Sequence, residues 1–552
     1  MQPHGRWWRE WEVWLLAVVV GAIYLTRLGE PPCGGEESAR GQIAREMAQG
    51  NDWVVPRLQG APVLAYYPPM HNWLIALVAV ARGSLDEVTI RFPSAVAVLL
   101  LVFLLYGYSR TFLSRLGAFA AAAAFATTGH VLQLGRLGET DALFMLFASG
   151  ALLVWRWADV RGKPALVGWC AGYTLVALGM LTKGAQAPVY FAGGVGGYLL
   201  LTRRWRILLQ WPHFVGIALF VVLCAAWEIP YFFRAGADDS WVMLSTHFTS
   251  RVGAFNWPAF CKHFAIFPLE VAAGMLPWSI LLLAYVWRGF RRTIGPAREH
   301  LWFLVCPIGV ALLSCWLLPG GRNRHFAAIY PCFAPLIGLV VQRCCEALAA
   351  IPRPANLWTR YLRAMGVIMP VVGVWVATAT ALGWGPSRGA QPPAFAAAYL
   401  LAAAALGVLA IAASRSSRPS YHRLGILSIT VFLGLSVTGV MHNVYFALRE
   451  PIAENIGELK QRLPQDSPLV SVGLVDSNFV FYYGAPIRPL SPGELAGRTP
   501  SDWTYCCVNG EPSQLGSRFP HEVIAVISCK GIRSSSPKNV VTVARRLTAS
   551  QR

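Results

Sequence analysis

Long apolar runs constrain the fold of this chain more than any other feature of its sequence. A helix that crosses a bilayer needs about 20 mostly apolar residues, because about 30 Å of hydrocarbon is spanned at a rise of about 1.5 Å per residue. Thirteen runs approach this length, at about 11–28, 92–109, 114–133, 140–157, 164–181, 185–202, 208–231, 264–287, 301–318, 325–345, 364–384, 393–413 and 424–446. They predict an all-α polytopic membrane protein.

The composition agrees with a membrane protein. Apolar residues make up 55% of the 552 residues and charged residues only 13%, whereas about 25% of the residues in a soluble domain are charged. A net charge of +20 would also suit a nucleic-acid-binding protein. The Lys and Arg residues, however, lie in short clusters between the apolar runs, which is typical of a topology signal. We therefore expect membrane lipids, and no nucleic acid, as partners.

One short apolar run decides the orientation. Trp73 to Ala81 contains nine residues, too few to cross a bilayer, so it is predicted to be an interfacial helix. If this run is not counted as a membrane span, the basic clusters in every second loop all lie on the same side of the membrane. The positive-inside rule assigns this side to the cytoplasm. The chain is then a multi-pass protein of the inner membrane with a cytoplasmic amino terminus, and its first run is predicted to be a retained anchor.

The last 100 residues or so differ in kind. A helical stretch at 452–463 is followed by strand-like runs at 469–475, 479–484 and 522–528, separated by Pro, Gly and Ser. The sequence predicts a transmembrane domain at 1–449, with large periplasmic loops at 29–91 and 232–263, and a small periplasmic α/β domain at 450–552. It leaves open whether a disulfide forms among Cys506, Cys507 and Cys529 in this outward part.

Polar residues gather at the ends of the runs that face outward. Alone, each such residue could cap a helix or extend to the lipid headgroups. Asp141, however, lies inside an apolar run, where an ionisable group is costly unless it faces a partner or a watery cavity. Carboxylates beside cations suit an anionic lipid headgroup and general-base chemistry. The candidates are Glu36, Glu37, Arg40, Asp141, Lys183, His247, Arg251, Arg322 and Arg324.

Short segments of the chain resemble a known family. E-E-S-A-R-G-Q-I-A-R-E-M at 36–47 resembles the D-E-T-R-Y-A-E-I-A-R-E-M segment of bacterial aminoarabinose-lipid A transferases and their relatives, the protein O-mannosyltransferases, which are polytopic C-type glycosyltransferases. Further similar pieces follow in the same order, among them G-R-L-G-E-T-D-A-L at 135–143, L-T-K-G at 181–184 and H-F-T-S-R at 247–251. The resemblance implies thirteen spans and an outward carboxyl-terminal domain.

The resemblance also implies roles for individual residues. Glu36 stands where the family carries its catalytic loop Asp, and Asp141 matches the second functional acid. Lys183 matches a Lys near the lipid phosphate, and Arg324 stands close to a Lys that precedes the tenth span. The residues expected to bind substrate are Glu37, Arg40, Lys183, His247, Arg251, Arg322 and Arg324.

The sequence leaves the requirement for a divalent metal open. In some relatives a Glu before a proline and the loop His are thought to hold a divalent metal. Before Pro68 this chain has Ala65, Tyr66 and Tyr67 instead, so a metal at His247 is doubtful and no cofactor is certain.

The expected activity is that of a membrane glycosyltransferase. It would transfer a sugar from a polyprenyl-phosphate-linked donor to lipid A or another envelope glycolipid at the periplasmic face. The anomeric centre would be inverted, because no dedicated nucleophile is evident. Two alternatives stay open. One is transfer to Ser or Thr of a protein, and the other is a non-enzymatic lipid or solute transporter in which the acids relay protons.

Overall fold

The computed structural model describes residues 7–50, 52–62, 68–235, 256–318, 321–347, 352–384, 389–464, 468–491, 494, 503–515, 520–529 and 539–547. The chain packs into two compact units. The first contains residues 1–27, 64–71 and 91–441, and the second contains residues 28–63, 72–90 and 442–552. The domain boundary that the sequence predicts between residues 449 and 450 stays a prediction.

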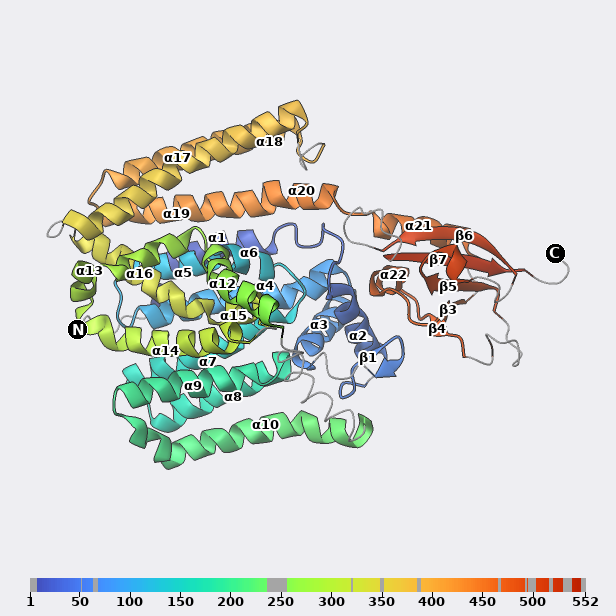
Figure 1. The fold of residues 1–552 in the computed structure, drawn as a ribbon, viewed down its shortest axis with the longest axis horizontal. Coiled ribbons are helices and arrows are strands. Elements are labelled where there is room, and N and C mark those ends of the chain that lie inside the picture. The colour runs from blue at the N-terminus through green and yellow to red at the C-terminus, as the bar shows by residue number, and fades with distance from the viewer. Residues whose placement is uncertain are drawn as a thin grey trace. The chain divides into compact units, whose positions relative to one another are not determined.

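The chain up to residue 447 is almost entirely helical where it is described (Figure 1). Its longer helices are α1 (Trp11–Leu25), α2 (Glu37–Gly50), α3 (Met70–Arg82), α4 (Glu87–Ser109), α5 (Arg115–Ala126), α7 (Thr140–Val160), α8 (Ala165–Lys183), α9 (Gln186–Leu201), α10 (Trp211–Ala235), α12 (Trp257–Gly274), α14 (Arg298–Trp316), α16 (Tyr330–Ala347), α17 (Pro352–Leu382), α18 (Pro393–Ser414) and α19 (Pro419–Leu435). Shorter pieces are α6 (Gly129–Leu134), η3 (Trp278–Val286), α13 (Arg288–Thr293), α15 (Asn323–Phe326), η5 (Ala327–Ile329) and α20 (His442–Ala447).

Small residues let the helices of the first unit pack closely. Helix α5 is rich in alanine, and all of its residues from Leu116 to Ala126 are buried. Gly338 of α16 lies so near the carbonyl oxygen of Gly117 that a Cβ at Gly338 would collide with it. Close approach of backbones at small residues is the usual way in which membrane helices gain packing energy.

Within the described residues, nine helices are long and apolar enough to cross a bilayer, or ten if the bent pair of α12 and η3 is one span. This agrees with a mostly helical multi-pass membrane protein. It does not reach the predicted count of thirteen, partly because two predicted runs are interrupted. The run at 114–133 breaks at Thr127 and Thr128, between α5 and α6, and the run at 264–287 bends by 115° between α12 and η3.

The short run at 73–81 is helical, as the sequence predicts. It lies within α3, which has 13 residues and is too short to count as a span. Ile75 and Ala76 are buried, whereas Leu77 and Val80 are exposed. An exposed apolar face suits an interfacial position.

The carboxyl-terminal part contains a five-stranded mixed sheet with the order β4-β3-β5-β7-β6 (Figure 1). Strand β3 pairs in parallel with β4 and β5, and β7 pairs antiparallel with β5 and β6. The strands are β3 (Leu469–Val472), β4 (Arg488–Pro489), β5 (Tyr505–Asn509), β6 (His521–Ser528) and β7 (Val540–Arg546), and the helices beside them are α21 (Ile452–Arg462) and α22 (Ser477–Tyr483). Ile456 of α21 and Phe479 of α22 join Val543 of the sheet in one apolar core.

One predicted strand is wrong. The run at 479–484 is not a strand, because most of it belongs to helix α22. The side chain of Asp476 accepts a hydrogen bond from the backbone N–H of Asn478 at 2.8 Å and so caps the amino terminus of this helix. Gly484 ends the helix with a positive φ of 76°. These two caps outweigh the strand preference of the aromatic residues between them.

No disulfide forms in this structure. All twelve cysteines lie in the described part of the chain and none is disulfide-bonded. Cys506 and Cys507 are neighbours on strand β5 and therefore point to opposite faces of the sheet. Cys507 belongs to the core that contains Cys529, and Cys506 belongs to the core on the other face.

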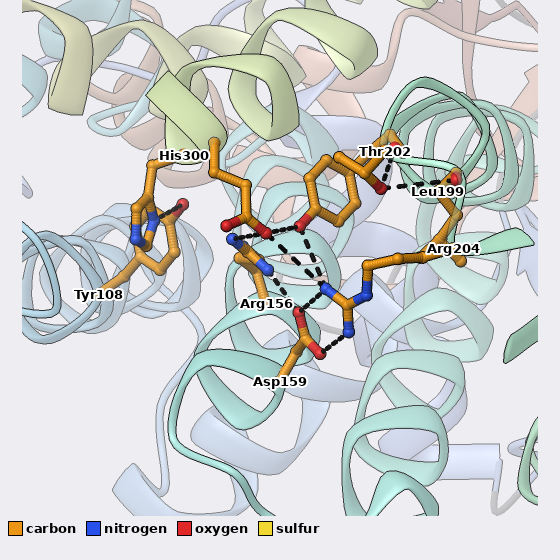
Figure 2. Close-up of polar contacts among 9 residues, drawn as sticks. Tyr108, Arg156, Asp159, Leu199, Thr202, Arg204 and His300 are labelled. Atoms are coloured by element: carbon orange, nitrogen blue, oxygen red, sulfur yellow. Dashed lines mark hydrogen bonds and ion pairs between the residues drawn. The ribbon is translucent and has the colours of Figure 1, made fainter. Parts of the chain in front are cut away.

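An ionic cluster lies at the carboxyl end of α7 (Figure 2). Arg156, whose side chain is 3% exposed, donates hydrogen bonds to Asp159 and, at 3.0 Å, to Glu299 of α14. Arg204 pairs with the other oxygen of Asp159 at 2.6 Å. Tyr198 donates to Glu299 at 2.5 Å, and its ring lies under the Arg156 guanidinium. Each charged side chain contacts a side chain of opposite charge, which is typical of a structural cluster, and this one joins α7, α9 and α14.

Replacing Arg156 with Met should destabilise the protein by about 1 to 3 kcal/mol, because a buried cation and its hydrogen bonds to two acids are lost. The free energy of unfolding in detergent, followed by tryptophan fluorescence, measures this effect. Arg343→Met is the matched control, since Arg343 pairs with Glu346 at the same three-residue spacing on a more exposed surface, where a pair contributes less than about 1 kcal/mol. Equal effects of the two substitutions would contradict a stabilising role of the cluster.

Candidate functional site

Ionic side chains from three helices meet at the other end of α7. Helix α8 packs against α7 and follows it after a short turn, so the amino end of α7 and the carboxyl end of α8 lie at the same end of the pair. Asp141 is in the first turn of α7, and Lys183 is the last residue of α8. Arg324 comes from α15, which leads into α16. The structure thus brings together three residues that the sequence predicts as site residues.

The carboxylate of Asp141 is the centre of this cluster. Its side chain is 2% exposed, and one oxygen accepts a hydrogen bond from Nζ of Lys183. The other oxygen accepts from Nη2 of Arg324 and, at 3.2 Å, from its Nε. Arg324 also donates to Glu139. We call Glu139, Asp141, Lys183 and Arg324 the acid–base cluster.

The two cations are the more accessible members of the acid–base cluster. The side chain of Arg324 is 30% exposed and that of Lys183 is 16% exposed, whereas both acids are below 10%. Charge-assisted bonds from both sides hold the acids in place. The arrangement therefore presents cationic groups outward, which suits an anionic ligand.

Local sequence explains why these charges sit at helix ends. An acid in the first turn of α7 and a cation in the last turn of α8 both interact favourably with the helix dipoles. Gly184 ends α8 with a φ of 84°, a backbone conformation that side chains disfavour. The chain then turns directly into α9, so Lys183 is held at the helix terminus.

A series of hydrogen bonds holds the helix that carries Arg324 in place. His130 and the hydroxyl of Tyr330 lie 3.3 Å apart, and this hydroxyl donates to Asn323 Oδ1 at 2.9 Å. The amide nitrogen of Asn323 in turn donates to the backbone carbonyl of Glu270 at 2.9 Å. Asn323 is next to Arg324 in sequence, so these contacts restrict the position of the arginine.

The other predicted acids belong to the second unit. Glu36 precedes α2, its side chain is 44% exposed, and Arg40 donates to it at 2.8 Å. Glu37, the first residue of α2, is buried, and its carboxylate accepts from the backbone N–H of Gly34 at 2.9 Å. Glu37 therefore closes the turn before the helix, whereas Glu36 is accessible to solvent.

This chain is similar in sequence to known sugar transferases. The model of the dolichyl-phosphate-mannose-protein mannosyltransferase family matches residues 67–229. The undecaprenyl phosphate-alpha-4-amino-4-deoxy-L-arabinose arabinosyl transferase of Pseudomonas aeruginosa (strain LESB58) is 29% identical over 334 residues, which cover 58% of this chain and 57% of that protein. The transferase of the same name from Aeromonas hydrophila is 27% identical over 61% of this chain and 60% of its own length. The chain is similar to these transferases over a little more than half of their length.

The fold of a solved transferase matches nearly all of this chain. The crystal structure of ArnT from Cupriavidus metallidurans bound to undecaprenyl phosphate matches with a TM-score of 0.69 and 17% identity, over 98% of both chains. The apo form of the same ArnT matches with a TM-score of 0.65. The chain therefore has an ArnT-like fold, although the sequence match spans only about 57% of the curated transferases.

Not every predicted site residue can be placed in this ArnT-like fold. His247 and Arg251 lie outside the described residues. Arg322 is exposed at the start of α15, where its backbone N–H donates to His325 Nδ1 at 3.4 Å. Among the residues that the structure describes, no three His, Cys, Asp or Glu side chains gather as a metal-binding group. Because His247 lies outside the described residues, the expectation about a metal stays a prediction.

Glu139 is a member of the acid–base cluster that is not among the residues predicted from the sequence. It shares the cation Arg324 with Asp141, and its own backbone carbonyl accepts from the hydroxyl of Ser94 at 3.2 Å. The signal was its spacing, because it stands two residues before Asp141 in the same E-T-D segment.

Proposed function

We propose that this protein is a glycosyltransferase that moves a sugar from a polyprenyl-phosphate carrier to an envelope acceptor. The acid–base cluster carries this proposal. Lys183 and Arg324 are cations at helix ends, held by buried acids and more exposed than those acids. Cations held in a fixed arrangement suit a phosphate whose negative charge grows as the sugar leaves.

The relatives support a lipid-linked donor. The ArnT of the matched structure was crystallised with undecaprenyl phosphate, and the curated relatives are arabinosyl transferases named for undecaprenyl-phosphate-linked aminoarabinose. A donor that is already in the membrane needs no nucleotide-binding fold. The same lipid-linked donor class is proposed for this chain, while the identity of the sugar is not specified.

The proposed reaction is a single displacement at the anomeric carbon. The acceptor hydroxyl attacks C1, so that a new C1–O bond forms while the bond between C1 and the phosphate oxygen breaks. The hydroxyl proton passes to Glu36, and the bonding electrons leave with polyprenyl phosphate, whose charge Lys183 and Arg324 neutralise. Asp141 positions both cations. The configuration at C1 is inverted, and no step requires a resident metal.

Two acceptor classes are consistent with the relatives. The resemblance of residues 36–47 to aminoarabinose-lipid A transferases favours lipid A or another glycolipid as acceptor, and this is our first proposal. The mannosyltransferase family model favours Ser or Thr of a protein as the second candidate. Both keep the same donor and the same acid–base cluster.

The proposal includes a topology. Thirteen spans with a cytoplasmic amino terminus would put the amino end of α7 and the α/β domain at 450–552 on the periplasmic side. The segments shorter than a normal span, such as α1 and α5, would then cross together with the residues that flank them. The positive-inside distribution of Arg and Lys supports this orientation.

Loss of donor binding tests the role of the cations. Lys183→Met and Arg324→Met should each raise the Kd for undecaprenyl phosphate by about 10- to 100-fold, because one charge-assisted bond to phosphate contributes about 1.5 to 3 kcal/mol. Native mass spectrometry of the detergent-solubilised protein measures the binding. Lys163→Met, at the opposite end of the α7–α8 pair, is the matched control and should leave the Kd unchanged. If Lys183→Met and Arg324→Met have the same Kd for undecaprenyl phosphate as Lys163→Met, the acid–base cluster is not a phosphate site.

A further inference from the structure

A pocket of about 370 Å³ lies within the second unit. One wall is formed by Gln42, Arg45 and Gln49 of α2, which recur at helical spacing. The segment from Ala485 to Pro489, which follows α22 and contains β4, also lines the pocket. The volume is in the range of sites that bind small molecules. None of these residues belongs to the acid–base cluster.

Gln42 has an unused acceptor in this wall. Its side chain is 2% exposed, and its amide nitrogen donates to the carbonyl of Ser477 at 2.6 Å. Its Oε1 accepts no hydrogen bond from the residues that the structure describes. A buried carbonyl oxygen without a donor is uncommon because it loses its bonds to water. A ligand hydroxyl at this wall would supply the missing donor after a small adjustment of the side chain.

The charge of the pocket favours an anionic ligand. Arg45 and Arg488 line it together with one acid, Glu46. Arg488 already donates to both oxygens of Glu494, at 2.8 Å and 3.0 Å, so Arg45 is the lining cation without a carboxylate partner among the described residues. Both oxygens of Glu46 already accept from backbone N–H groups, those of Gln59 at 2.7 Å and Gly60 at 3.2 Å. Burial lowers the pKa of Arg45, and burial together with the nearby Arg45 lowers the pKa of Lys460. A bound anion would stabilise the charged form of the partly buried Arg45.

Apolar and amide groups complete the pocket. Val480, Pro486 and Ile487 offer an aliphatic surface, and Gln49, which is exposed, adds a free amide to the rim. A sugar ring presents C–H groups on one face and hydroxyl groups at its edge, so it matches both kinds of surface. We propose that this pocket binds an acidic saccharide, a pyranose that carries a carboxylate or a phosphate. The proposal goes beyond the transfer reaction and does not depend on it.

Binding of simple sugars to the full-length protein in lipid nanodiscs tests the proposal. Saturation-transfer NMR with D-glucuronate, D-glucose and acetate separates the contribution of the sugar ring to binding from the contribution of the carboxylate charge. Glucuronate should bind with a millimolar or lower Kd, glucose should bind at least about fivefold more weakly, and acetate should give no saturable signal. Equal binding of acetate and glucuronate would mean a plain anion site and overturn the proposal, as would no binding of glucuronate.

Matched variants locate the site. Arg45→Met should raise the Kd for glucuronate about tenfold, and Gln49→Ala about threefold to fivefold. The controls are Arg462→Met and Gln461→Ala, exposed residues at the end of α21 in the same unit, and they should leave the Kd unchanged. Arg45 also donates to the carbonyl of Phe481 at 3.1 Å, so its replacement could change the fold as well as the pocket. The Kd of Arg45→Met is therefore used only if its thermal unfolding temperature equals that of wild type; otherwise the Kd of Gln49→Ala tests the site. Binding that is insensitive to Gln49→Ala, or saturable binding of a short peptide in preference to glucuronate, would overturn the assignment.

Discussion

Replacing Glu36 with Gln should lower the rate of sugar transfer by about 10² to 10⁴, the range that a general base contributes. The substitution keeps the shape of the side chain and an oxygen that can accept the hydrogen bond from Arg40, but the amide cannot take the proton of an acceptor hydroxyl. Donor binding should change little, since the cations of the acid–base cluster are untouched. Transfer of a radiolabelled sugar by purified protein measures the rate, and binding of undecaprenyl phosphate measures the donor.

The control for Glu36 is an exposed acid that also has an arginine four residues later. Glu458 pairs with Arg462 at the same four-residue spacing on α21, and Glu458→Gln should keep the wild-type rate. Wild-type transfer by Glu36→Gln would remove Glu36 from the mechanism. A loss of donor binding equal to the loss of rate would make Glu36 a binding residue rather than a base.

Replacing Asp141 with Asn should lower kcat/KM for the donor by about 10² to 10³. The carboxylate bonds to both Lys183 and Arg324, and Asn cannot accept from both with the strength of a charge-assisted bond. The cations then lose the arrangement that the leaving phosphate needs. Steady-state kinetics with varied donor, together with the Kd for undecaprenyl phosphate, measure the effect.

Helix α7 offers a matched control at its other end. Asp159 is also held between two cations, Arg156 and Arg204, so Asp159→Asn makes the same chemical change in the same helix. It should lower stability while kcat/KM stays within about threefold of wild type. Equal kinetic losses in both variants would mean that the Asp141 variant acts only through folding.

The sequence predicted much of the helical framework because membrane crossing imposes a length and a composition that are visible locally. Helices occupy each of the thirteen predicted runs in the described residues, although two runs are interrupted. The segment at 479–484 was misassigned because its aromatic residues resemble a strand, while Asp476 and Gly484 cap it as a helix. Cap geometry depends on the backbone conformation of single residues, which apolar patterning does not report.

The candidate site divides in the same way. Asp141 was identifiable from the sequence because a charge inside an apolar run requires a partner, and Lys183 and Arg324 were identifiable as cations at span ends. The tertiary structure decided which groups pair. Lys183 is 42 positions from Asp141 in the sequence and Arg324 is 183 positions from it, so these side chains meet only when the helices pack. The second acid on Arg324, Glu139, and the pocket beside α2 also exist only in the folded chain. Their surroundings are built from segments that are far apart in the sequence, and the sequence pattern does not show which of these segments come into contact.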